Sequence, residues 1–292
     1  PEQIDYVIAN GSECEPYITC DDQLMRTQSN GIVEGMRLVL RLFPNAKGVI
    51  AIEDNKPEAI EAMTHACEGD ANLSVLPVMA KYPEGGERSL IGVVTGRQLR
   101  FGQLPADLGC VVCNVSTLNA IYRAVCKTEP LMGRLFTVSG DAVANPHTLF
   151  VRIGTSCSEL LEAAGGIKPG SEARKILCGG PMMGIAMSTL DAPIAKNNNA
   201  LTVLASDEVE LAEQQMTACL RCGRCGHVCP IGLVPQMMAE AAERQDYERY
   251  EKKLYGLDCI ACGSCTYICP AKRPLMQLFK QTKAVIMAAK RK

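Results

Sequence analysis

Two cysteine repeats in the last third of the chain have the residue types and the spacing of an iron–sulfur protein. Each repeat follows the pattern C-x2-C-x2-C-x3-C and is followed directly by Pro. In bacterial two-cluster ferredoxins this spacing lets three cysteines hold one cluster, while the fourth reaches over to the other. The sequence therefore predicts two [4Fe–4S] clusters. The predicted ligands of the first are Cys219, Cys222, Cys225 and Cys269, and those of the second are Cys259, Cys262, Cys265 and Cys229.

Zinc is the alternative metal for closely spaced cysteines. Structural zinc sites pair two C-x2-C units across about 12–20 residues and use only four ligands. Two tandem runs of four cysteines do not fit that pattern. His227 lies inside the first repeat and is interpreted as a surface or supporting residue rather than a ligand.

The total cysteine count indicates a reducing compartment. The chain has 16 cysteines in 292 residues, and half of them lie in the repeats. A secreted disulfide scaffold is usually shorter than this. The first residues show neither the basic start nor the apolar stretch of a signal peptide. Because the chain also has no initiator Met, it is expected to be part of a longer protein.

Composition excludes several classes of function. The net charge is −2, aromatic residues make up 4% and Trp is absent, which argues against nucleic-acid binding. No apolar run approaches the roughly 18–20 residues that a membrane span needs. Hydrophobic residues at 47% and charged residues at 21% are ordinary for a globular protein of two or three domains.

The first 130 residues alternate between strand-like and helix-like stretches. Such alternation is typical of an α/β layer with a largely parallel sheet, here a Rossmann-like domain. Ser116 or Thr117 is expected to cap the last helix. The predicted strands are Tyr6–Ala9, Gly48–Glu53, Leu73–Met79 and Cys110–Val115, and the predicted helices are Gln23–Phe43, a segment ending at Cys67, and Leu118–Lys127.

Two further modules follow. Residues 131–204 predict a small β-rich module with one helix, Cys157–Ala164, and Leu201–Ala205 is interpreted as the junction to the next domain. Residues 205–292 predict an all-α domain around the two repeats, linked by the helical stretch Met237–Tyr255. Cys110 and Cys113 mimic a metal clamp, but side chains three apart on a strand face opposite sides of the sheet, so they are expected to be buried apolar residues.

Polar side chains follow three of the predicted strands, where parallel sheets place their ligand loops. Glu13 and Glu15 come just after the first strand and its Asn10. Glu87 lies in a Gly-rich loop, and Asn114 precedes a helix whose N-terminus favours an anion or a polar ring edge. A solvated turn at each place is the alternative interpretation.

These motifs resemble a known family. Residues 10–16, 86–87 and 114–117, in this order and followed by the twin repeats, resemble the C subunit of the Rnf electron-transport complex. The segments 258–275 and 179–184 are especially similar to that family. Residues 134–166 resemble its soluble-ligand-binding β-grasp (SLBB) module. The first half is also similar to the flavin subunit of respiratory complex I.

The resemblance implies that FMN lies on the first domain and that NAD(H) stacks on the flavin. The residues that it places around these cofactors are Asn10, Glu13, Glu15, Gly86, Glu87, Asn114 and Thr117, with Glu15 towards the nicotinamide. The family's Gly-rich loop, which cradles the flavin phosphate, precedes the motif at Asn10 and is missing here. The full-length protein is thus expected to bind FMN, and this chain to bind little or none.

The implied function is that of a peripheral electron-transfer subunit in an ion-translocating ferredoxin–NAD+ oxidoreductase. Electrons would pass between NAD(H), FMN and the two clusters. The implied partners are the other Rnf membrane subunits and ferredoxin, and the implied location is the cytoplasmic face of the bacterial cell membrane. Two alternatives remain: a soluble flavin and iron–sulfur reductase of the cobalamin-reductase type, and a non-catalytic iron–sulfur relay.

Overall fold

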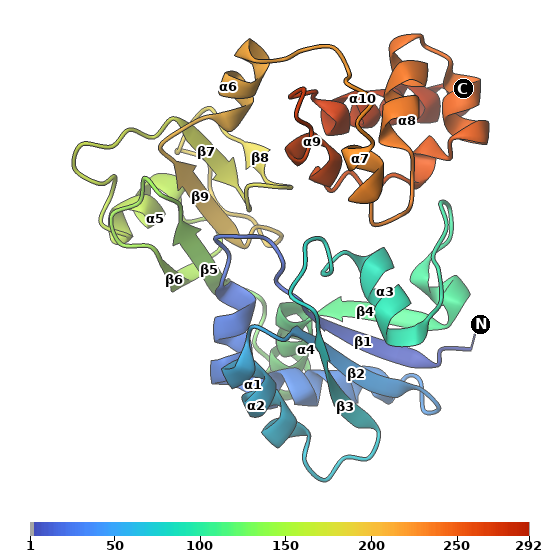
Figure 1. The fold of residues 1–292 in the computed structure, drawn as a ribbon. Helices are drawn as coiled ribbons and strands as arrows, with labels where there is room; N and C mark the ends of the chain where they lie inside the picture. The colour runs from blue at the N-terminus through green and yellow to red at the C-terminus, as the bar shows by residue number, and fades with distance from the viewer. Residues whose placement is uncertain (1–2, 292) are drawn as a thin grey trace. The chain divides into compact units, whose positions relative to one another are not determined.

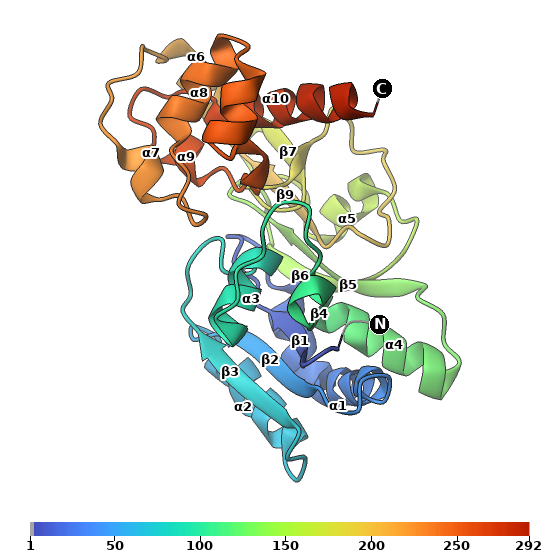
Figure 2. The same ribbon diagram turned by 90° about the vertical axis from the view of Figure 1, so that its right-hand side faces the viewer.

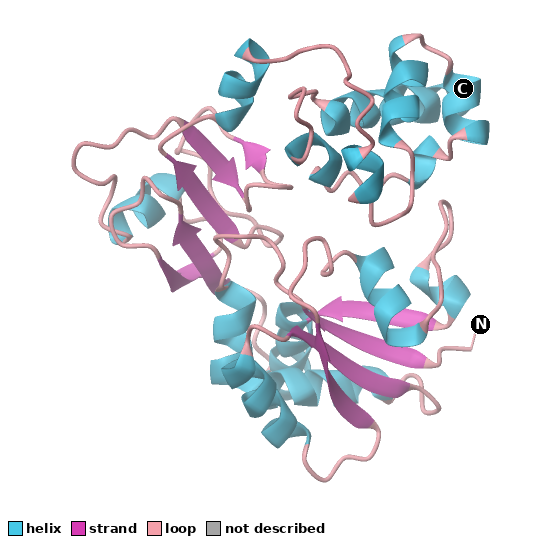
Figure 3. Cartoon of the chain, in the orientation of Figure 1, coloured by secondary structure: helices cyan, strands magenta, loops and turns pink. Residues whose placement is uncertain are grey.

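The computed structural model describes residues 3–291, which form two compact units, 3–205 and 206–291. Figure 1 shows the fold coloured along the chain, and Figure 3 shows that strands occur in the first unit while the second is helical. Within residues 3–291, no helix combines the length and the apolar character that crossing a membrane requires.

The first sheet is parallel and contains four strands in the order β3-β2-β1-β4. Its strands are β1 (Tyr6–Gly11), β2 (Lys47–Glu53), β3 (Leu73–Val78) and β4 (Cys110–Asn114). The helices around it are α1 (Cys20–Leu40), α2 (Pro57–Cys67), α3 (Glu87–Thr95) and α4 (Val115–Lys127), and a 3₁₀ turn spans Pro105–Leu108. The prediction of an α/β first domain is confirmed.

Helices cover both faces of this sheet, which is why its central strands carry almost only apolar residues. The helices α1, α2 and α4 pack against one face, and α3 packs against the other through Leu90 and Ile91 (Figure 2). Cys110 belongs to the core under α3, whereas Cys113 packs into the core on the opposite face. The two cysteines therefore do not converge, as their spacing on a strand predicts.

One helix of this domain was not predicted, and one local expectation is wrong. Glu87 was expected in a Gly-rich loop and is the first residue of α3, which Gly96 ends in the left-handed conformation (φ 72°). Neither Ser116 nor Thr117 caps α4, because β4 ends one residue earlier than expected. The cap is Asn114, whose side-chain oxygen accepts a hydrogen bond from the Ser116 amide at 2.8 Å.

The second sheet is mixed and has five strands in the order β6-β5-β9-β7-β8. They are β5 (Gly133–Ser139), β6 (His147–Arg152), β7 (Lys175–Cys178), β8 (Ile185–Ala186) and β9 (Ala200–Leu204), with one helix, α5 (Cys157–Ala163). The segment Leu201–Ala205 was predicted as the junction to the next domain, and the two compact units do divide directly after Ala205, but the segment is not a linker. Most of it forms β9, which lies between β5 and β7, because Leu201, Thr202 and Val203 are fully buried.

The second unit is helical, as predicted. Its helices are α6 (Glu208–Gln214), α7 (Arg224–His227), α8 (Pro235–Glu243), α9 (Ser264–Tyr267) and α10 (Leu275–Lys290), with a π-helical turn over Arg249–Lys253 and a 3₁₀ turn over Gly256–Asp258. The stretch expected as one linking helix, Met237–Tyr255, is broken after Glu243. The breaking residue is Gln245, which has a φ of 58°.

Candidate iron–sulfur and flavin sites

The two cysteine repeats fold into the same backbone turn, 40 residues apart. Arg221 and Ala261 have φ values of 53° and 55°, and Gly223 and Gly263 have 77° and 82°. Each glycine is followed by a one-turn helix, α7 or α9. The left-handed glycine is sterically favourable here, because a Cβ is disfavoured in this conformation. The repeated sequence motif thus forms the same backbone structure twice.

The second repeat encloses a pocket that gathers the four predicted ligands of one cluster. Cys229 lines it together with Cys259, Cys262 and Cys265. The remaining lining is almost entirely apolar and includes Met238 from α8 and Phe279 from α10. Such a lining lowers the local dielectric constant and keeps water from a cluster. The structure therefore brings Cys229 to the other repeat's three cysteines, as the crossed assignment requires.

The four predicted ligands of the other cluster are less enclosed. Cys219 and Cys222 are exposed, while Cys225 and Cys269 are half-buried. Cys269 lies close enough to Cys225 that its charge contributes to raising the pKa of the Cys225 thiol, after the larger contribution of burial. The Arg221 amide points at Cys219 Sγ at 3.4 Å, and the Ala261 amide points at Cys259 Sγ at the same distance.

The distances between the sulfur atoms discriminate between zinc and a cluster. Four thiolates around one zinc ion, with Zn–S bonds of about 2.3 Å, must lie about 3.8 Å apart. In residues 3–291, no three of the eight cysteines have sulfur atoms all within 4.8 Å of one another. The cysteines are therefore not gathered as tightly as a single zinc ion would require.

The chemistry of the donor set also fits iron–sulfur binding. Burial, followed by the charges of Cys259, Cys262 and Cys229, raises the pKa of the Cys265 thiol to about 12. Burial likewise raises the pKa of Cys259. Four thiolates can share this apolar pocket only when a cation offsets their charge. Bound iron would supply this positive charge at the site that these residues form.

The flavin candidates lie at the carboxyl edge of the parallel sheet. β1 runs between β2 and β4, and the chain order reverses direction there, so the crevice beside β1 is where α/β sheets bind ligands. Asn10 and Asn114 are direct neighbours in the register of β1 and β4. Two of the predicted residues, 104 positions apart, are thereby brought together.

Both asparagines hold the surrounding loops in place. Asn10 Nδ2 donates to the Gly85 carbonyl at 2.9 Å, and its Oδ1 accepts from the Ser12 amide at 3.1 Å. Asn114 Nδ2 donates to Asp21 Oδ2 at 2.7 Å. The loop after β1, the loop before α3 and the start of α1 are therefore connected through these two side chains.

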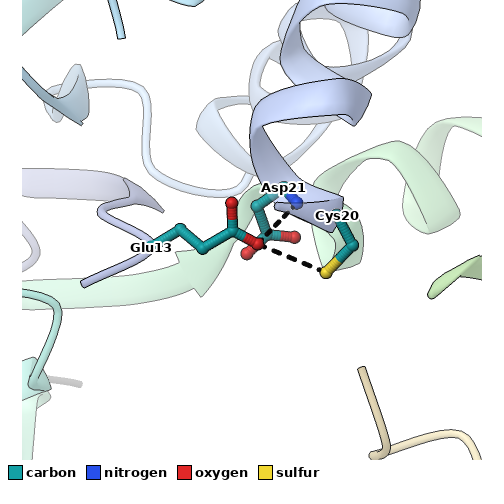
Figure 4. Close-up of side chains that lie close together, drawn as sticks. All are labelled: Glu13, Cys20 and Asp21. Atoms are coloured by element: carbon teal, nitrogen blue, oxygen red, sulfur yellow. Dashed lines mark hydrogen bonds between the residues drawn. The ribbon is translucent and has the colours of Figure 1, made fainter. Parts of the chain in front are cut away.

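Glu13 and Asp21 form a buried pair of carboxyl groups beside Cys20 (Figure 4). Glu13 Oε1 accepts from the Asp21 amide at 2.9 Å and from Cys20 Sγ at 3.3 Å. Burial, followed by the charge of Asp21, raises the pKa of Glu13 to about 7, although Lys56 opposes the shift. Burial also raises the pKa of Asp21. This pair is thus suited to holding a proton near neutral pH.

Lys56 joins this group from the start of α2. Its Nζ lies 3.7 Å from Glu13 Oε2 and 3.1 Å from Glu53 Oε2, and the three side chains are almost fully buried. No sequence motif predicted that Lys56, Asp21 and Cys20 would belong to this group of buried polar side chains. The only sequence signal for them was the position of Lys56 and Asp21 at helix starts that follow strands of the parallel sheet.

Glu15 points away from the sheet edge, towards the β-grasp module. Its Oε2 accepts from the Met182 amide at 3.1 Å and from the Met183 amide at 3.4 Å. Gly180 approaches so closely that a Cβ there would lie 2.1 Å from the same oxygen. Glu15 therefore anchors the loop between β7 and β8 and is not grouped with Asn10 and Asn114.

Removing this anchor should release the loop. In Glu15→Ala, we expect hydrogen exchange of the Met182 and Met183 amides to become about 10- to 100-fold faster, the equivalent of a hydrogen bond to a charged acceptor. Glu15→Gln keeps one acceptor and should show a smaller change. The Thr19 amide donates to Thr137 Oγ1 and serves as the internal control. Unchanged exchange at Met182 in Glu15→Ala would contradict this role.

The remaining flavin candidates lie at the edges of the same region. Gly86 is the N-cap of α3, Glu87 is its exposed first residue, and Thr117 is exposed on the first turn of α4. Two buried polar atoms here have no partner among the described residues, Ser12 Oγ and Glu84 Oε1. They flank Gly85, where a Cβ would lie 2.2 Å from the Ser12 carbonyl. Unpaired polar atoms and a backbone approach that excludes side chains fit a polar ring system such as a flavin.

Cys14, in the same loop, has the properties of a structural thiol. It is half-buried, and burial raises the pKa of its thiol above the usual value. A thiol that stays protonated is a poor nucleophile.

Comparison with known families assigns all three modules. Residues 1–123 match the Nuo51 FMN-binding domain, residues 135–186 match the SLBB domain, and residues 218–274 match the 4Fe-4S dicluster domain. These matches support FMN and iron–sulfur clusters as cofactors. They also confirm the order of fold classes expected from the sequence.

Whole-chain relatives share one description. The chain is 43% identical over 288 residues to the C subunit of the proton-translocating ferredoxin:NAD(+) oxidoreductase complex of Clostridium ljungdahlii, covering 99% of this chain. Over almost its whole length the chain is therefore similar to these C subunits. A second relative is the C subunit of the Na(+)-translocating ferredoxin:NAD(+) oxidoreductase complex of Acetobacterium woodii, 41% identical over 291 residues and 100% of this chain.

The chain covers 62% and 65% of the lengths of these two relatives. It covers 44% of a third relative, the C subunit of the ion-translocating oxidoreductase complex of Haemophilus influenzae, to which it is 43% identical over its full length. Among solved structures, NAD+-reducing [NiFe]-hydrogenase in the H2-reduced state contains a chain with the same fold. The TM-score is 0.60 at 23% identity over 97% of this chain and 57% of that chain.

Proposed function

We propose that the protein to which this chain belongs is a peripheral electron-transfer subunit of an ion-translocating ferredoxin:NAD+ oxidoreductase complex. It would pass electrons between NAD(H) and two [4Fe–4S] clusters by way of FMN. Its partners would be the other subunits of that complex, with ferredoxin as the opposite electron carrier. Its place would be the cytoplasmic face of the bacterial cell membrane.

The observation that carries this proposal is the combination of sites in one chain that is similar to these C subunits. One unit has a parallel sheet whose ligand edge fits a flavin, and the other has a duplicated cysteine turn with Cys229 placed among the second repeat's cysteines. FMN can take up two electrons as a hydride and release them singly, and iron–sulfur clusters carry single electrons. The chain itself supplies positions and local charges for these groups.

Residue assignments follow from the same proposal. Cys219, Cys222, Cys225 and Cys269 would hold one cluster, and Cys229, Cys259, Cys262 and Cys265 the other. Asn10, Glu13 and Asn114 would shape the flavin edge with Gly86, Glu87 and Thr117, and Glu15 would support it indirectly. We place the three modules at residues 1–130, 131–204 and 205–292, supported by the gap between α4 and β5 and by the division of the chain at residue 205.

Anaerobic reconstitution of the full-length protein tests this function. With FMN, iron and sulfide added, NADH should bleach the visible absorption of both clusters, and omission of FMN should abolish the bleaching. NADPH is the matched control and should reduce the clusters more slowly. Cluster reduction by NADH at the same rate without FMN would contradict the proposed route.

A further inference from the structure

The N-terminus of α1 binds a side chain from the loop before it. Glu13 Oε1 accepts a hydrogen bond from the Asp21 amide at 2.9 Å (Figure 4), and its Oε2 accepts one from the Asp22 amide at 3.2 Å. Both amides belong to the first turn of the helix, where they have no partner within the helix itself. The start of α1 therefore fixes the place of the Glu13 carboxyl group at the edge of the parallel sheet.

Thr19 is the N-cap residue of α1 but does not cap it. Threonine is favoured at this position because its side-chain oxygen can accept from an amide of the first turn. In α1, which the structure describes in full, the Thr19 side chain makes no such bond. Its backbone (φ −145°, ψ 11°) also lies outside the extended conformation that capping residues usually adopt. Thr19 and Glu13 are thus competitors for the same amides, and Glu13 holds them.

Two threonines of the β-grasp module hold Thr19 away from the cap. The Thr19 amide donates to Thr137 Oγ1 at 3.1 Å, and the Thr19 hydroxyl lies 3.0 Å from Thr148 Oγ1. Thr137 and Thr148 are paired in the register of β5 and β6, and their hydroxyl oxygens are 3.3 Å apart. The two strands thus bind both the backbone and the side chain of Thr19.

The neighbouring residues are fixed by the same module. Tyr17 has a left-handed backbone (φ 70°), which is unfavourable for a residue with a Cβ, and its carbonyl accepts from the Ser139 hydroxyl. Ile18 and Cys20 are buried in a small core with Ala200 of β9. An unfavourable conformation persists only while the surrounding contacts impose it. The start of α1 is therefore expected to rearrange when these contacts are removed.

We propose that Thr137 and Thr148 are positioning residues for Glu13. By holding Thr19 in a conformation that does not cap α1, they leave the amides of the first turn to the Glu13 carboxyl group. The inference rests on the proposed function, in which Glu13 lies at the flavin edge. It adds a role for the β-grasp module, which sets the place of this carboxyl group through Thr19.

The test replaces both threonines of the module by valine, which removes the hydroxyl groups and keeps the shape of the side chains. In Thr137→Val/Thr148→Val (the valine pair) of the 292-residue chain, Thr19 is free to cap α1 and to bind the Asp22 amide. Glu13 then loses a hydrogen bond that lowers its pKa in the wild type. We expect its carboxyl group to titrate about 1 pH unit higher than in the wild type.

Infrared absorption of the protonated carboxyl group measures this titration. Subtraction of the spectrum of Glu13→Gln assigns the band to Glu13 rather than to Asp21. The two side chains whose charges act on the pKa of Glu13, Asp21 and Lys56, are unchanged in the valine pair. The shift therefore reports the hydrogen bonds at the start of α1.

Three further variants separate this role from a general loosening of the module. Adding Thr19→Val to the valine pair removes the competing hydroxyl and should return the titration to its wild-type position. Thr137→Ser/Thr148→Ser keeps both hydroxyls and should titrate like the wild type. Thr202→Val is the matched control. It removes the hydroxyl of a buried threonine on β9, which donates to the Gly179 carbonyl at 2.8 Å, and should leave the titration unchanged.

Three results would overturn the positioning role. The first is an unchanged titration in the valine pair, and the second is an equal shift in Thr202→Val. The third is a triple variant, with Thr19→Val added, that titrates like the valine pair, because Thr19 would then not be the competing cap.

Failure of the proposed function has a different signature, because the titration requires neither flavin nor NADH. In the full-length protein, the valine pair should bind FMN about 10-fold more weakly than the wild type, and the triple variant should bind it like the wild type. A shifted titration with unchanged FMN affinity would uphold the positioning of Glu13 and would contradict its proposed place beside the flavin.

Discussion

In Cys229→Ala, we expect the loss of about four of about eight iron atoms, all from the cluster whose other ligands belong to the second repeat. The reason is the placement of Cys229 in the same pocket as Cys259, Cys262 and Cys265. Its own repeat should still bind a cluster, because Cys269 would complete that site. Electron paramagnetic resonance after chemical reduction should show one signal in place of two interacting ones.

A matched control is available because the chain carries cysteines outside the repeats. Cys126 is exposed on α4, and Cys126→Ala should leave the iron content unchanged. Cys269→Ala should produce the reciprocal loss, of the cluster that includes Cys219. Loss of the first repeat's cluster in Cys229→Ala, with the second cluster intact, would show that each repeat holds its own cluster without crossing.

The cluster domain could be predicted in detail because its chemistry is local in sequence. Ligand spacing, the following Pro and the left-handed Gly223 and Gly263 all lie within one short segment, repeated once. Exposure could not be predicted in this way. It depends on how α8 and α10 cover one repeat. The sequence gives only a hint of this, because the first repeat has Arg221 and Arg224 where the second has Ala261 and Ser264.

The β-rich module, in contrast, contains a strand that depends on residues far away in the sequence. The segment Leu201–Ala205 follows a loop-rich stretch and was predicted as a junction, not as a strand. It becomes β9 because it fills the gap between β5 and β7, whose residues are more than 20 positions away. Its β-branched and aliphatic residues are compatible with a strand, but only tertiary pairing decides the outcome.

The flavin candidates at the edge of the parallel sheet could be predicted only in part from the sequence. Strand ends and the polar residues that follow them predicted that Asn10, Glu13 and Asn114 lie at one edge, because parallel strands bring their carboxyl ends to the same edge of a sheet. Glu15, only two residues after Glu13, was assigned to the same edge, and its carboxylate instead meets the loop of another module. The direction of a loop side chain depends on the distant partner, here the Met182 amide, and not on local periodicity.

Stability should fall as pH rises from about 4.5 to about 7, in part because of Glu13. Its carboxyl group has an ordinary pKa of 4.5 and a pKa of about 7 in the folded protein, chiefly through burial. Within this window the folded chain keeps a proton that the unfolded chain has already released. Unfolding thus releases a proton, and the free energy of unfolding decreases with increasing pH, by about 3 kcal/mol in total, before levelling off above about pH 7.

Urea unfolding of the full chain at several pH values would measure this slope. Glu13→Gln carries no titratable group and should flatten the slope, so that the variant gains stability relative to the wild type above about pH 7. Lys56→Met should extend the window upwards, since the ammonium group of Lys56 lowers the pKa of Glu13. Infrared absorption of the protonated carboxyl group would follow the titration directly. A wild-type slope that survives unchanged in Glu13→Gln would show that Glu13 is not the group that holds the proton, and would shift the assignment to its buried neighbour Asp21.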